Sequence, residues 1–208
     1  MSKTLTVAST ASFSSRCIIP LLPKFYALYP DVQIRIVYAT KSTDTIDYDI
    51  DILIRNWDGP YVGPYESHTL LSGATQPVCS HSLLDRIGSQ VSAADWAGIN
   101  LLHDENHNAW GEWFDSAGIK PPDLNKGTTF EDFNLLSTAA VAGHGVALSP
   151  VNLVKEDIIR GHLAILSNIS ANRDRNYLFL HRKQGGRLVN KFRDWLLAEV
   201  GEYFHNMK

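Results

Sequence analysis

The sequence contains few of the residues that mark secreted, metal-rich or membrane-spanning proteins. Two cysteines, Cys17 and Cys79, occur far apart in 208 residues, each inside an apolar run. Disulfide scaffolds need more cysteines and metal sites need clustered ones, so both are expected to be reduced thiols in a core. No segment is long and apolar enough to span a bilayer, and the opening residues do not form a signal peptide. A cytoplasmic protein without membrane contact is therefore expected.

Basic charge is also scarce. The formal net charge is -3, with 19 Lys and Arg against 22 Asp and Glu. Domains that bind nucleic acid usually carry a basic patch or stripe, whereas the longest basic cluster here is the pair Arg182 and Lys183. Direct contact between this chain and DNA or RNA is therefore not expected.

The short motifs of common α/β enzymes are missing as well. The sequence has no G-x-S-x-G of serine hydrolases, no G-x-G-x-x-G of dinucleotide sites and no P-loop. It offers no evident nucleophile–base pair or metal cluster, so we predict a protein that is not an enzyme and uses no cofactor. Trp110, Trp113 and Phe114 lie at helical spacing, which is typical of a core, with stacking on an aromatic ligand as the alternative.

Two β-α-β patterns predict an α/β fold. The first consists of a strand at Leu5–Ala8, helically spaced apolar residues from 18 to 28, and a strand at Val32–Tyr38. The second leads from Thr128 through a helix to a strand at Val146–Ser149. Strands joined through a helix run parallel, so the sequence predicts parallel strands in an open α/β sheet.

Two polar segments allow a metal-binding alternative. His103 and His107 belong to HDENH, but the first ends a predicted strand and the second precedes a helix, so they do not share a helix face. Asp47, Asp49 and Asp51 alternate and would share one face of an extended strand, where they could hold a divalent cation. A polar loop and a solvated turn are the readings that we favour.

Hydroxyl side chains crowd two junctions between a strand and the next helix. Ser9, Thr10 and Ser12 form one, and Thr128–Thr129 forms the other, where the four residues beginning at Thr129 fit the S/T-x-x-D/E capping pattern. Ligands of open α/β sheets bind beyond the carboxyl ends of the strands, and helix N-termini favour oxygen-rich or anionic groups. Capping needs one hydroxyl per helix, so both capping and ligand binding remain open.

Six segments, in this order and spacing, resemble the effector-binding domain of LysR-type transcription regulators. The resemblance runs from about Thr4 to about Val200 and is strongest to the branch around the glycine-cleavage activator and the β-lactamase regulator. The segments are TLTVASTASFSSRCIIPLLPKFYALYPDVQIRI, STDTIDYDIDILIRNWDG, PVCSHSLL, NLLHDENHNAWGEWFDSAGI, GTTFEDFNLLSTAAVAGHGVALSPVNLV and NKFRDWLLAEV.

The resemblance implies a fold like that of type 2 periplasmic binding proteins, in which two Rossmann-like α/β lobes are joined by two crossover strands. The crossovers are expected near Gly73–Val78 and Ala147–Val151. Residues 1–74 and 151–208 would form lobe I, and residues 75–150 lobe II. The family also has an N-terminal winged helix-turn-helix that is absent from this sequence, so DNA binding is implied only through that domain.

A small polar or anionic effector is implied between the lobes, together with a homodimer that is a tetramer in the full-length form. The exposed helix faces, including the one from Ser12 to Tyr29, are candidates for the dimer surface. A solute-binding protein of a transporter is the alternative function. The residues implied as ligand contacts are Ser9, Thr10, Ser12, Phe13, Tyr38, Arg55, Thr75, Gln76, His103, Thr128 and Phe130.

For Arg55 and His103, a role within the protein itself is the alternative to ligand binding. Arg55 suits a ligand carboxylate, which a guanidinium binds with two parallel hydrogen bonds, or it forms an ion pair with Asp58. His103 donates to the ligand or holds its own loop through Asp104.

Overall fold

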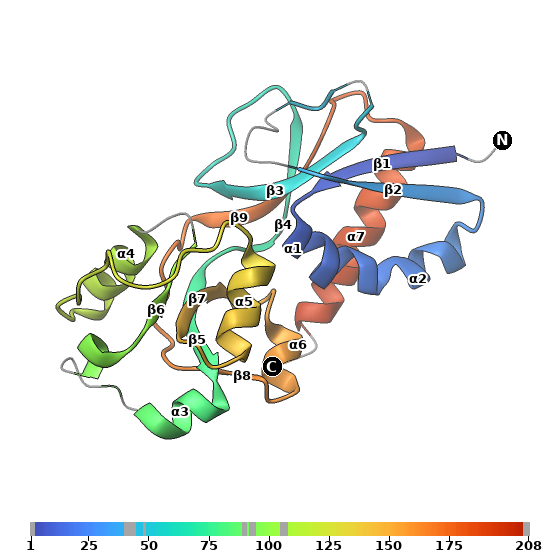
Figure 1. Ribbon diagram of the computed structural model, residues 1–208. Coiled ribbons are helices and arrows are strands. Elements are labelled where there is room, and N and C mark those ends of the chain that lie inside the picture. Colours follow the sequence, from blue (N-terminus) through green and yellow to red (C-terminus); the bar gives the residue numbers. More distant parts are fainter. Residues whose placement is uncertain are drawn as a thin grey trace. The chain divides into compact units, whose positions relative to one another are not determined.

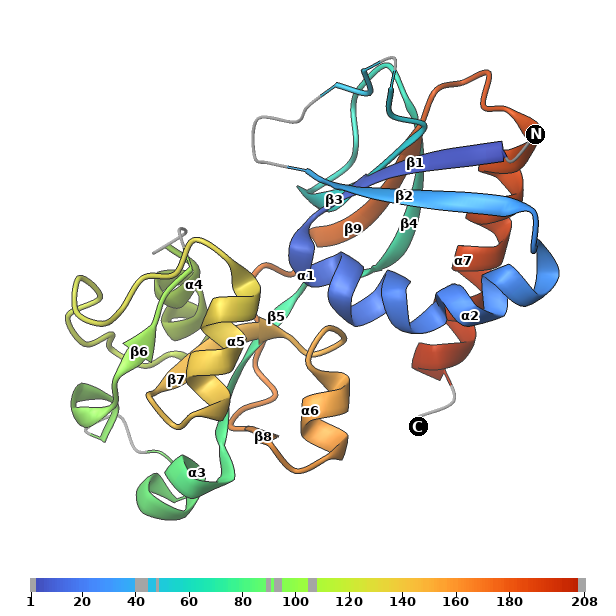
Figure 2. The same ribbon diagram turned by 45° about the vertical axis from the view of Figure 1, so that its right-hand side comes forward.

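The chain folds into two compact α/β units. The computed structural model describes residues 3–39, 45–47, 49–88, 91, 95–104 and 108–205. The first unit comprises Met1–Ser72 and Arg175–Lys208, and the second comprises Gly73–Asp174 (Figures 1 and 2). The chain therefore enters the second unit after Ser72 and leaves it before Arg175. No helix in the described part of the chain is long and apolar enough to cross a bilayer.

A five-stranded sheet, in the order β2-β1-β3-β9-β4, forms the first unit. Its elements are β1 (Lys3–Ser9), α1 (Ala11–Phe13), the π-helical turn η1 (Ser14–Ile18), α2 (Ile19–Leu28), β2 (Val32–Tyr38), β3 (Ile52–Asp58), β4 (Glu66–Ser72), β9 (Arg175–His181) and α7 (Arg187–His205). Strand β1 pairs in parallel with β2 and β3, which confirms the first β-α-β prediction. Strand β9 lies antiparallel between β3 and β4.

Helices α2 and α7 pack side by side on one face of this sheet (Figure 2). Phe25 of α2 contacts both Phe192 and Trp195 of α7, with ring centroids 5.1 and 4.8 Å apart. The continuous helical run from α1 to α2 contains Pro20 and Pro23. Proline cannot donate to the preceding turn, and the wider π turn directly before Pro20 relieves the clash that its ring would cause.

The second unit contains a four-stranded sheet in the order β6-β7-β5-β8. Its elements are β5 (Thr75–Ser80), α3 (His81–Ile87), the 3-10 turn η2 (Asp95–Gly98), β6 (Leu101–Leu102), α4 (Asn108–Ala117), α5 (Phe133–Val141), β7 (Val146–Pro150), α6 (Lys155–Ile159) and β8 (Leu163–Ile165). Strands β6 and β7 are parallel, whereas β5 pairs antiparallel with both β7 and β8. Trp110, Trp113 and Phe114 are at most 1% exposed in a core that also holds Trp96 and Cys79, so their predicted core role is confirmed.

The return crossing differs in position from the sequence prediction, which placed it at Ala147–Val151. The chain instead continues through α6 and β8, and β8 pairs with β5. Leu163 of β8 is completely buried against Val78 and its neighbours. Residues 151–174 therefore belong to the second unit, and the chain crosses back at Asp174–Arg175.

Candidate functional site

The predicted ligand contacts of the first unit come together at one edge of its sheet. Ser9, the last residue of β1, pairs with Tyr38 of β2 and with Ile54 of β3, and Arg55 follows Ile54. Because parallel strands end at the same edge, their last side chains collect there. Strand β4 also ends at this edge, and β9 begins there, since Ser72 pairs with Asn176.

The first helical turn after β1 uses one of its hydroxyls as a cap. Thr10 is the N-cap of α1, and its Oγ1 accepts from the Phe13 amide at 3.4 Å. The Ser14 amide donates to the Thr10 carbonyl at 3.0 Å. Ser9 Oγ donates to the same carbonyl at 3.3 Å, and Ser12 Oγ lies 3.4 Å from Thr10 Oγ1. The Ala11 and Ser12 amides are left without acceptors inside the helix, as in any first turn.

Phe13, Arg55 and Tyr38 have different exposures at this edge. Phe13 is completely buried, with its ring centroid 5.1 Å from that of Tyr177, so it supports the edge from within the core. Tyr38 is 60% exposed. The Arg55 guanidinium lies 5.9 Å from the centre of the Trp57 ring.

The sequence suggested an ion pair between Arg55 and Asp58, but in the structure Asp58 pairs with Arg175. Arg175 holds Asp58 through two hydrogen bonds, from Nε to Oδ1 at 2.8 Å and from Nη2 to Oδ2 at 3.4 Å. These two residues pair directly across β3 and β9. The bidentate geometry, which suits guanidinium and carboxylate, therefore belongs to Arg175.

His103 organises the corresponding edge of the second unit. It follows β6, is 1% exposed, and its Nε2 lies 2.8 Å from the Lys126 carbonyl, to which it donates. Its backbone accepts from the Phe130 amide at 2.8 Å and donates to the Thr128 carbonyl at 2.9 Å. His103 thus fixes the segment from Lys126 to Phe130 against the end of β6, so it holds a loop that is distant in sequence.

Thr75 and Gln76 begin β5 at the same end of the sheet, because Thr75 pairs with Pro150, the last residue of β7. Thr75 exchanges two backbone hydrogen bonds with Ala171, at 3.0 and 2.9 Å. Its Oγ1 accepts from Asn172 Nδ2 at 3.0 Å. Gln76 Nε2 donates to the Asn168 carbonyl at 3.0 Å. The five predicted contacts of this unit therefore share one end of its sheet.

The predicted helix start at Thr129 is wrong. Helix α5 begins at Phe133, and its N-cap is Asp132, whose Oδ1 accepts from the Asn134 amide at 2.8 Å. Thr129 instead forms an isolated parallel bridge with His103. The hydroxyls of Thr128 and Thr129 therefore precede the helix by a short extended segment.

The structure describes the two candidate metal-binding segments, HDENH and Asp47–Asp51, to different extents. Residues 105–107 of HDENH lie outside the described residues. Asp51 Oδ2 accepts from the Thr6 amide at 2.8 Å, and Asp47 Oδ1 accepts from Thr45 Oγ1 at 3.2 Å. Asp47 also closes a turn by accepting from the Ile50 amide, which agrees with the turn that the sequence favoured for Asp47 and Asp49.

Two residues near the second edge were not singled out from the sequence. Asn172 has φ 52, the one positive value at a non-glycine position in the described part of the chain, and asparagine tolerates this conformation better than most residues. Ser149 of β7 is completely buried next to Gln76, and its Oγ has no hydrogen-bond partner among the described residues. A serine inside the apolar run VALSP was the available signal for it.

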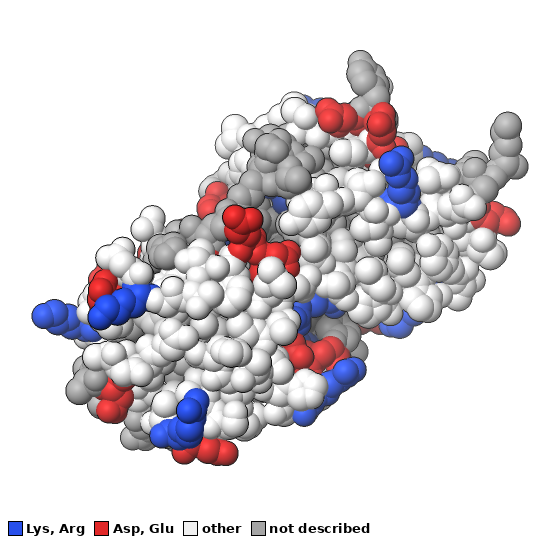
Figure 3. All heavy atoms as spheres, viewed as in Figure 1, with Lys and Arg blue, Asp and Glu red and all other residues white. Residues whose placement is uncertain are grey.

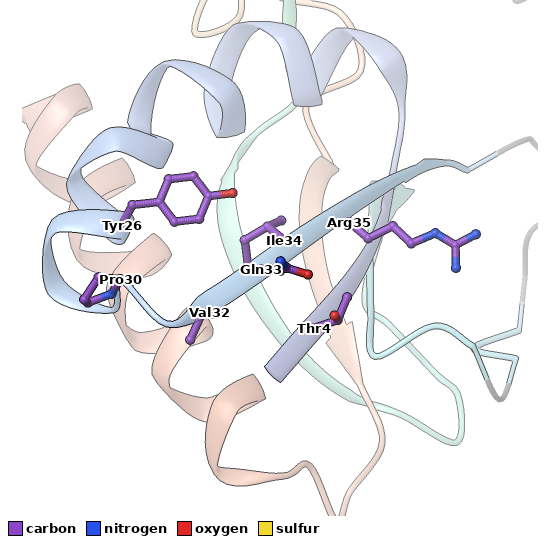
Figure 4. A pocket seen from close by; sticks show the side chains of 7 residues that line it. All are labelled: Thr4, Tyr26, Pro30, Val32, Gln33, Ile34 and Arg35. Carbon is purple, nitrogen blue, oxygen red and sulfur yellow. The ribbon is translucent and has the colours of Figure 1, made fainter. Parts of the chain in front are cut away.

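A shallow hollow lies elsewhere on the first unit, between α2 and the edge strand β2 (Figure 4). It is lined by Thr4, Tyr26, Pro30, Val32, Gln33, Ile34 and Arg35. Thr4 is near the amino end of β1, whereas Ser9 ends that strand. The hollow is therefore separate from the hydroxyl-rich edge.

Comparison with known proteins gives a consistent result. The family described as LysR substrate binding domain matches residues 1–201. The glycine cleavage system transcriptional activator of Escherichia coli K12 is 29% identical over 94% of this chain and 65% of its own length. The transcriptional activator AmpR of Rhodobacter capsulatus is 25% identical over 95% of this chain and 67% of its own length. The chain thus spans about 65% of the first of these relatives.

The solved structures agree with the sequence comparison. The AmpR effector binding domain from Citrobacter freundii has a TM-score of 0.82 at 22% identity, covering 96% of this chain and 99% of that one. The structure therefore has the type 2 periplasmic-binding-protein fold that the sequence predicted. The relatives are transcription regulators, which does not favour the alternative of a transporter's solute-binding protein.

Proposed function

The chain belongs to the LysR substrate-binding domains, and on that basis we propose that it is the ligand-sensing domain of a LysR-type transcription regulator, which binds a small polar or anionic effector. The observation that carries the proposal is the gathering of the predicted contacts at one edge of each sheet. In each unit this edge is also the one at which the crossing segments enter or leave.

The side chains at the two edges favour an oxygen-rich ligand. The first unit offers the hydroxyls of Ser9 and Ser12, the amides of the first helical turn and the Arg55 guanidinium. Amides at a helix start attract negative charge, and a guanidinium binds a carboxylate through two hydrogen bonds. The second unit adds the Thr128 hydroxyl, which can donate to a further oxygen atom, and Gln76, whose Nε2 donates to Asn168 and Ser170 and whose Oε1 can accept.

Signalling would follow from a change in the arrangement of the units. An effector shifts such an equilibrium only by its different affinities for the two arrangements. The hinge would consist of the crossings after Ser72 and before Arg175, next to the hydrogen-bonded pair Thr75 and Ala171. In the whole regulator this movement would be transmitted to an N-terminal DNA-binding domain. We place the protein in the cytoplasm and assign it no enzymatic activity, because its relatives are transcription regulators.

The effector is tested by thermal unfolding with amino acids, small carboxylates, nucleobases and cell-wall fragments, followed by native mass spectrometry of each hit. At a hundredfold excess over Kd, a true effector raises the melting temperature by about 5–10 °C. Ser12→Ala and Thr128→Val should each abolish most of this rise. Ser67→Ala and Thr138→Val, which change exposed hydroxyls outside the two edges, should keep it. A rise that survives both edge substitutions would disprove the site.

We also propose that α2 and the edge strand β2 form a homodimer surface. Ile19, Tyr26 and Leu28 of α2 are 51%, 37% and 63% exposed. The hollow of Figure 4 adjoins them, and few charges cover the part of Figure 3 that α2 occupies. Strand β2 has no neighbour on its outer side in the described sheet, so it offers backbone groups for pairing.

Light scattering tests the dimer surface. The chain should have the mass of a dimer, and Leu28→Glu should reduce it to the mass of a monomer, because a charge buried in an apolar interface is costly. Val62→Glu is the matched control, since Val62 is 86% exposed outside this surface. A dimer that tolerates Leu28→Glu, or a monomer at high concentration, would contradict the proposal.

A further inference from the structure

Three side chains at the edge of the first unit's sheet converge on one point, and we propose that they bind a zinc-class transition-metal ion. They are Glu66 and His68 of β4 and His181 of β9. Glu66 pairs directly with His181 across the two strands, and His68 pairs with Phe179. Alternate residues of a strand share a face, so all three side chains lie on the same side of the sheet. Among the described residues they form the one group with metal-ligating geometry.

The distances suit a single small ion. His68 Nε2 lies 3.2 Å from His181 Nε2, and His181 Nε2 lies 3.6 Å from Glu66 Oε2. Two nitrogens bound at zinc's usual distance in a tetrahedron are about 3.4 Å apart. The three ligand atoms all lie within 4.8 Å of one another. The Glu66 side chain is 48% exposed, so its carboxylate can move toward the two imidazole nitrogens.

The imidazole of His181 is held in the orientation that a metal requires. Its Nδ1 lies 2.8 Å from the Arg182 carbonyl, which can only accept, so Nδ1 carries the proton. In the neutral ring Nε2 then carries a lone pair directed at His68 Nε2, and a hydrogen bond like the one at Nδ1 commonly supports a metal-binding histidine. A methyl group at Gly185 would lie 2.8 Å from Nδ1, so glycine leaves room for the ring.

The Arg193 guanidinium and the Phe179 ring form the surroundings of His68. Arg193 is itself held by Asp194 Oδ1 at 2.8 Å and Asn190 Oδ1 at 3.1 Å. Phe179 packs edge-on against both histidine rings. The ligand set is thus two nitrogens and one oxygen on an apolar base, which leaves a fourth position for water or another ligand.

The site would join the edge strand to its neighbour. Strands β4 and β9 are the two strands that continue into the crossings between the units. A bound ion would tie them together at the end away from the crossings, where Glu66 begins β4. Because the ligands belong to the folded state, binding would also stabilise the first unit.

The test uses the chain without an affinity tag, treated with a chelator and titrated with ZnCl₂ at neutral pH. Native mass spectrometry should show one Zn²⁺ per chain, and the melting temperature should rise by about 5–10 °C at a hundredfold excess over Kd. His68→Gln and Glu66→Gln, both on the edge strand, should each weaken binding by at least about 10–100-fold, the range seen when even an outer-shell partner is lost.

His81→Gln is the matched control, because His81 is an exposed histidine at the start of α3. It should bind Zn²⁺ as the unchanged chain does. Co²⁺ provides a second readout, since its visible absorption reports tetrahedral coordination, and this signal should disappear in His68→Gln. Circular dichroism verifies that each variant is folded. Zinc uptake that is unchanged in both edge-strand variants, or no uptake at micromolar Zn²⁺, would disprove the site.

Discussion

The two hydroxyl-rich junctions have similar sequences and different structures. After β1, Thr10 caps the helix directly, and the chain turns into helix at the next residue. In the second unit, Thr128 and Thr129 remain extended against His103, and Asp132 caps the helix four residues later. In the first junction the hydroxyl of Thr10 caps the helix, whereas in the second the cap is the later acceptor Asp132. The carboxylate of Asp132 also interacts favourably with the helix dipole.

The two junctions also differ in what holds them in place. The first depends on side-chain hydroxyls and on the buried ring of Phe13. The second depends on backbone hydrogen bonds to His103 and on Gly127, whose φ is 113. Substitutions should therefore affect the second junction mainly through the backbone and the first through single hydrogen bonds.

Gly127→Ala should have the largest effect on stability. A Cβ at this position would lie 2.0 Å from the Leu101 carbonyl oxygen, and the backbone conformation is one that alanine rarely adopts. We expect the free energy of unfolding to fall by about 3 kcal/mol, measured by urea denaturation. Gly111→Ala in helix α4 is the control, because its Cβ would make an ordinary 3.7 Å contact with the Leu124 side chain. It should stabilise the chain by about 0.5–1 kcal/mol. Equal effects of the two substitutions would contradict the comparison.

Cysteine labelling can locate that loss of stability. Burial raises the pKa of Cys17 in the first unit to about 12 and that of Cys79 in the second unit to about 11. Both thiols should therefore react slowly with iodoacetamide at pH 8 in the folded chain. Gly127→Ala should speed labelling of Cys79 by about 100-fold if only the second unit opens, with Cys17 still protected. Equal acceleration at both thiols would show that the two units unfold together.

Local sequence predicted the elements of the first unit well. The helical spacing of apolar residues from 18 to 28 defined a helix between two strands, and parallel pairing of β1 with β2 followed from their order. The ends of these strands then placed Ser9 and Tyr38 at one edge. The placement of residues 151–174 in lobe I differs from the structure, because β8 pairs with β5 of the second unit, and this partner depends on the packing of Leu163.

The contacts that shape the candidate sites are mostly distant in sequence. The side chain of His103 donates to the carbonyl of Lys126, which is 23 residues away. Sequence reasoning considered only the neighbouring Asp104, because it could not detect a partner so distant in the chain. His68 and His181 are 113 residues apart, and no spacing rule connects them. They meet because β4 and β9 pair in one particular register. Pairing register of this kind is set by the whole sheet and cannot be read from either segment alone.

The smallest expected differences come from the two caps. Asp132→Ala should lower the free energy of unfolding by about 1 kcal/mol, because its 2.8 Å hydrogen bond to the Asn134 amide and its charge at the helix start are both lost. Thr10→Ala should cost less, about 0.5 kcal/mol, since its bond to the Phe13 amide is longer, at 3.4 Å, and uncharged.

Denaturation in urea at two salt concentrations separates the two caps. Salt should reduce the loss in Asp132→Ala, because it screens the interaction of the carboxylate with the helix dipole, and should leave Thr10→Ala unchanged. A larger loss in Thr10→Ala than in Asp132→Ala would mean that the first junction depends on its hydroxyl for more than capping. The Thr10 hydroxyl, which lies next to Ser12 Oγ, would then also stabilise the conformation of this edge of the sheet.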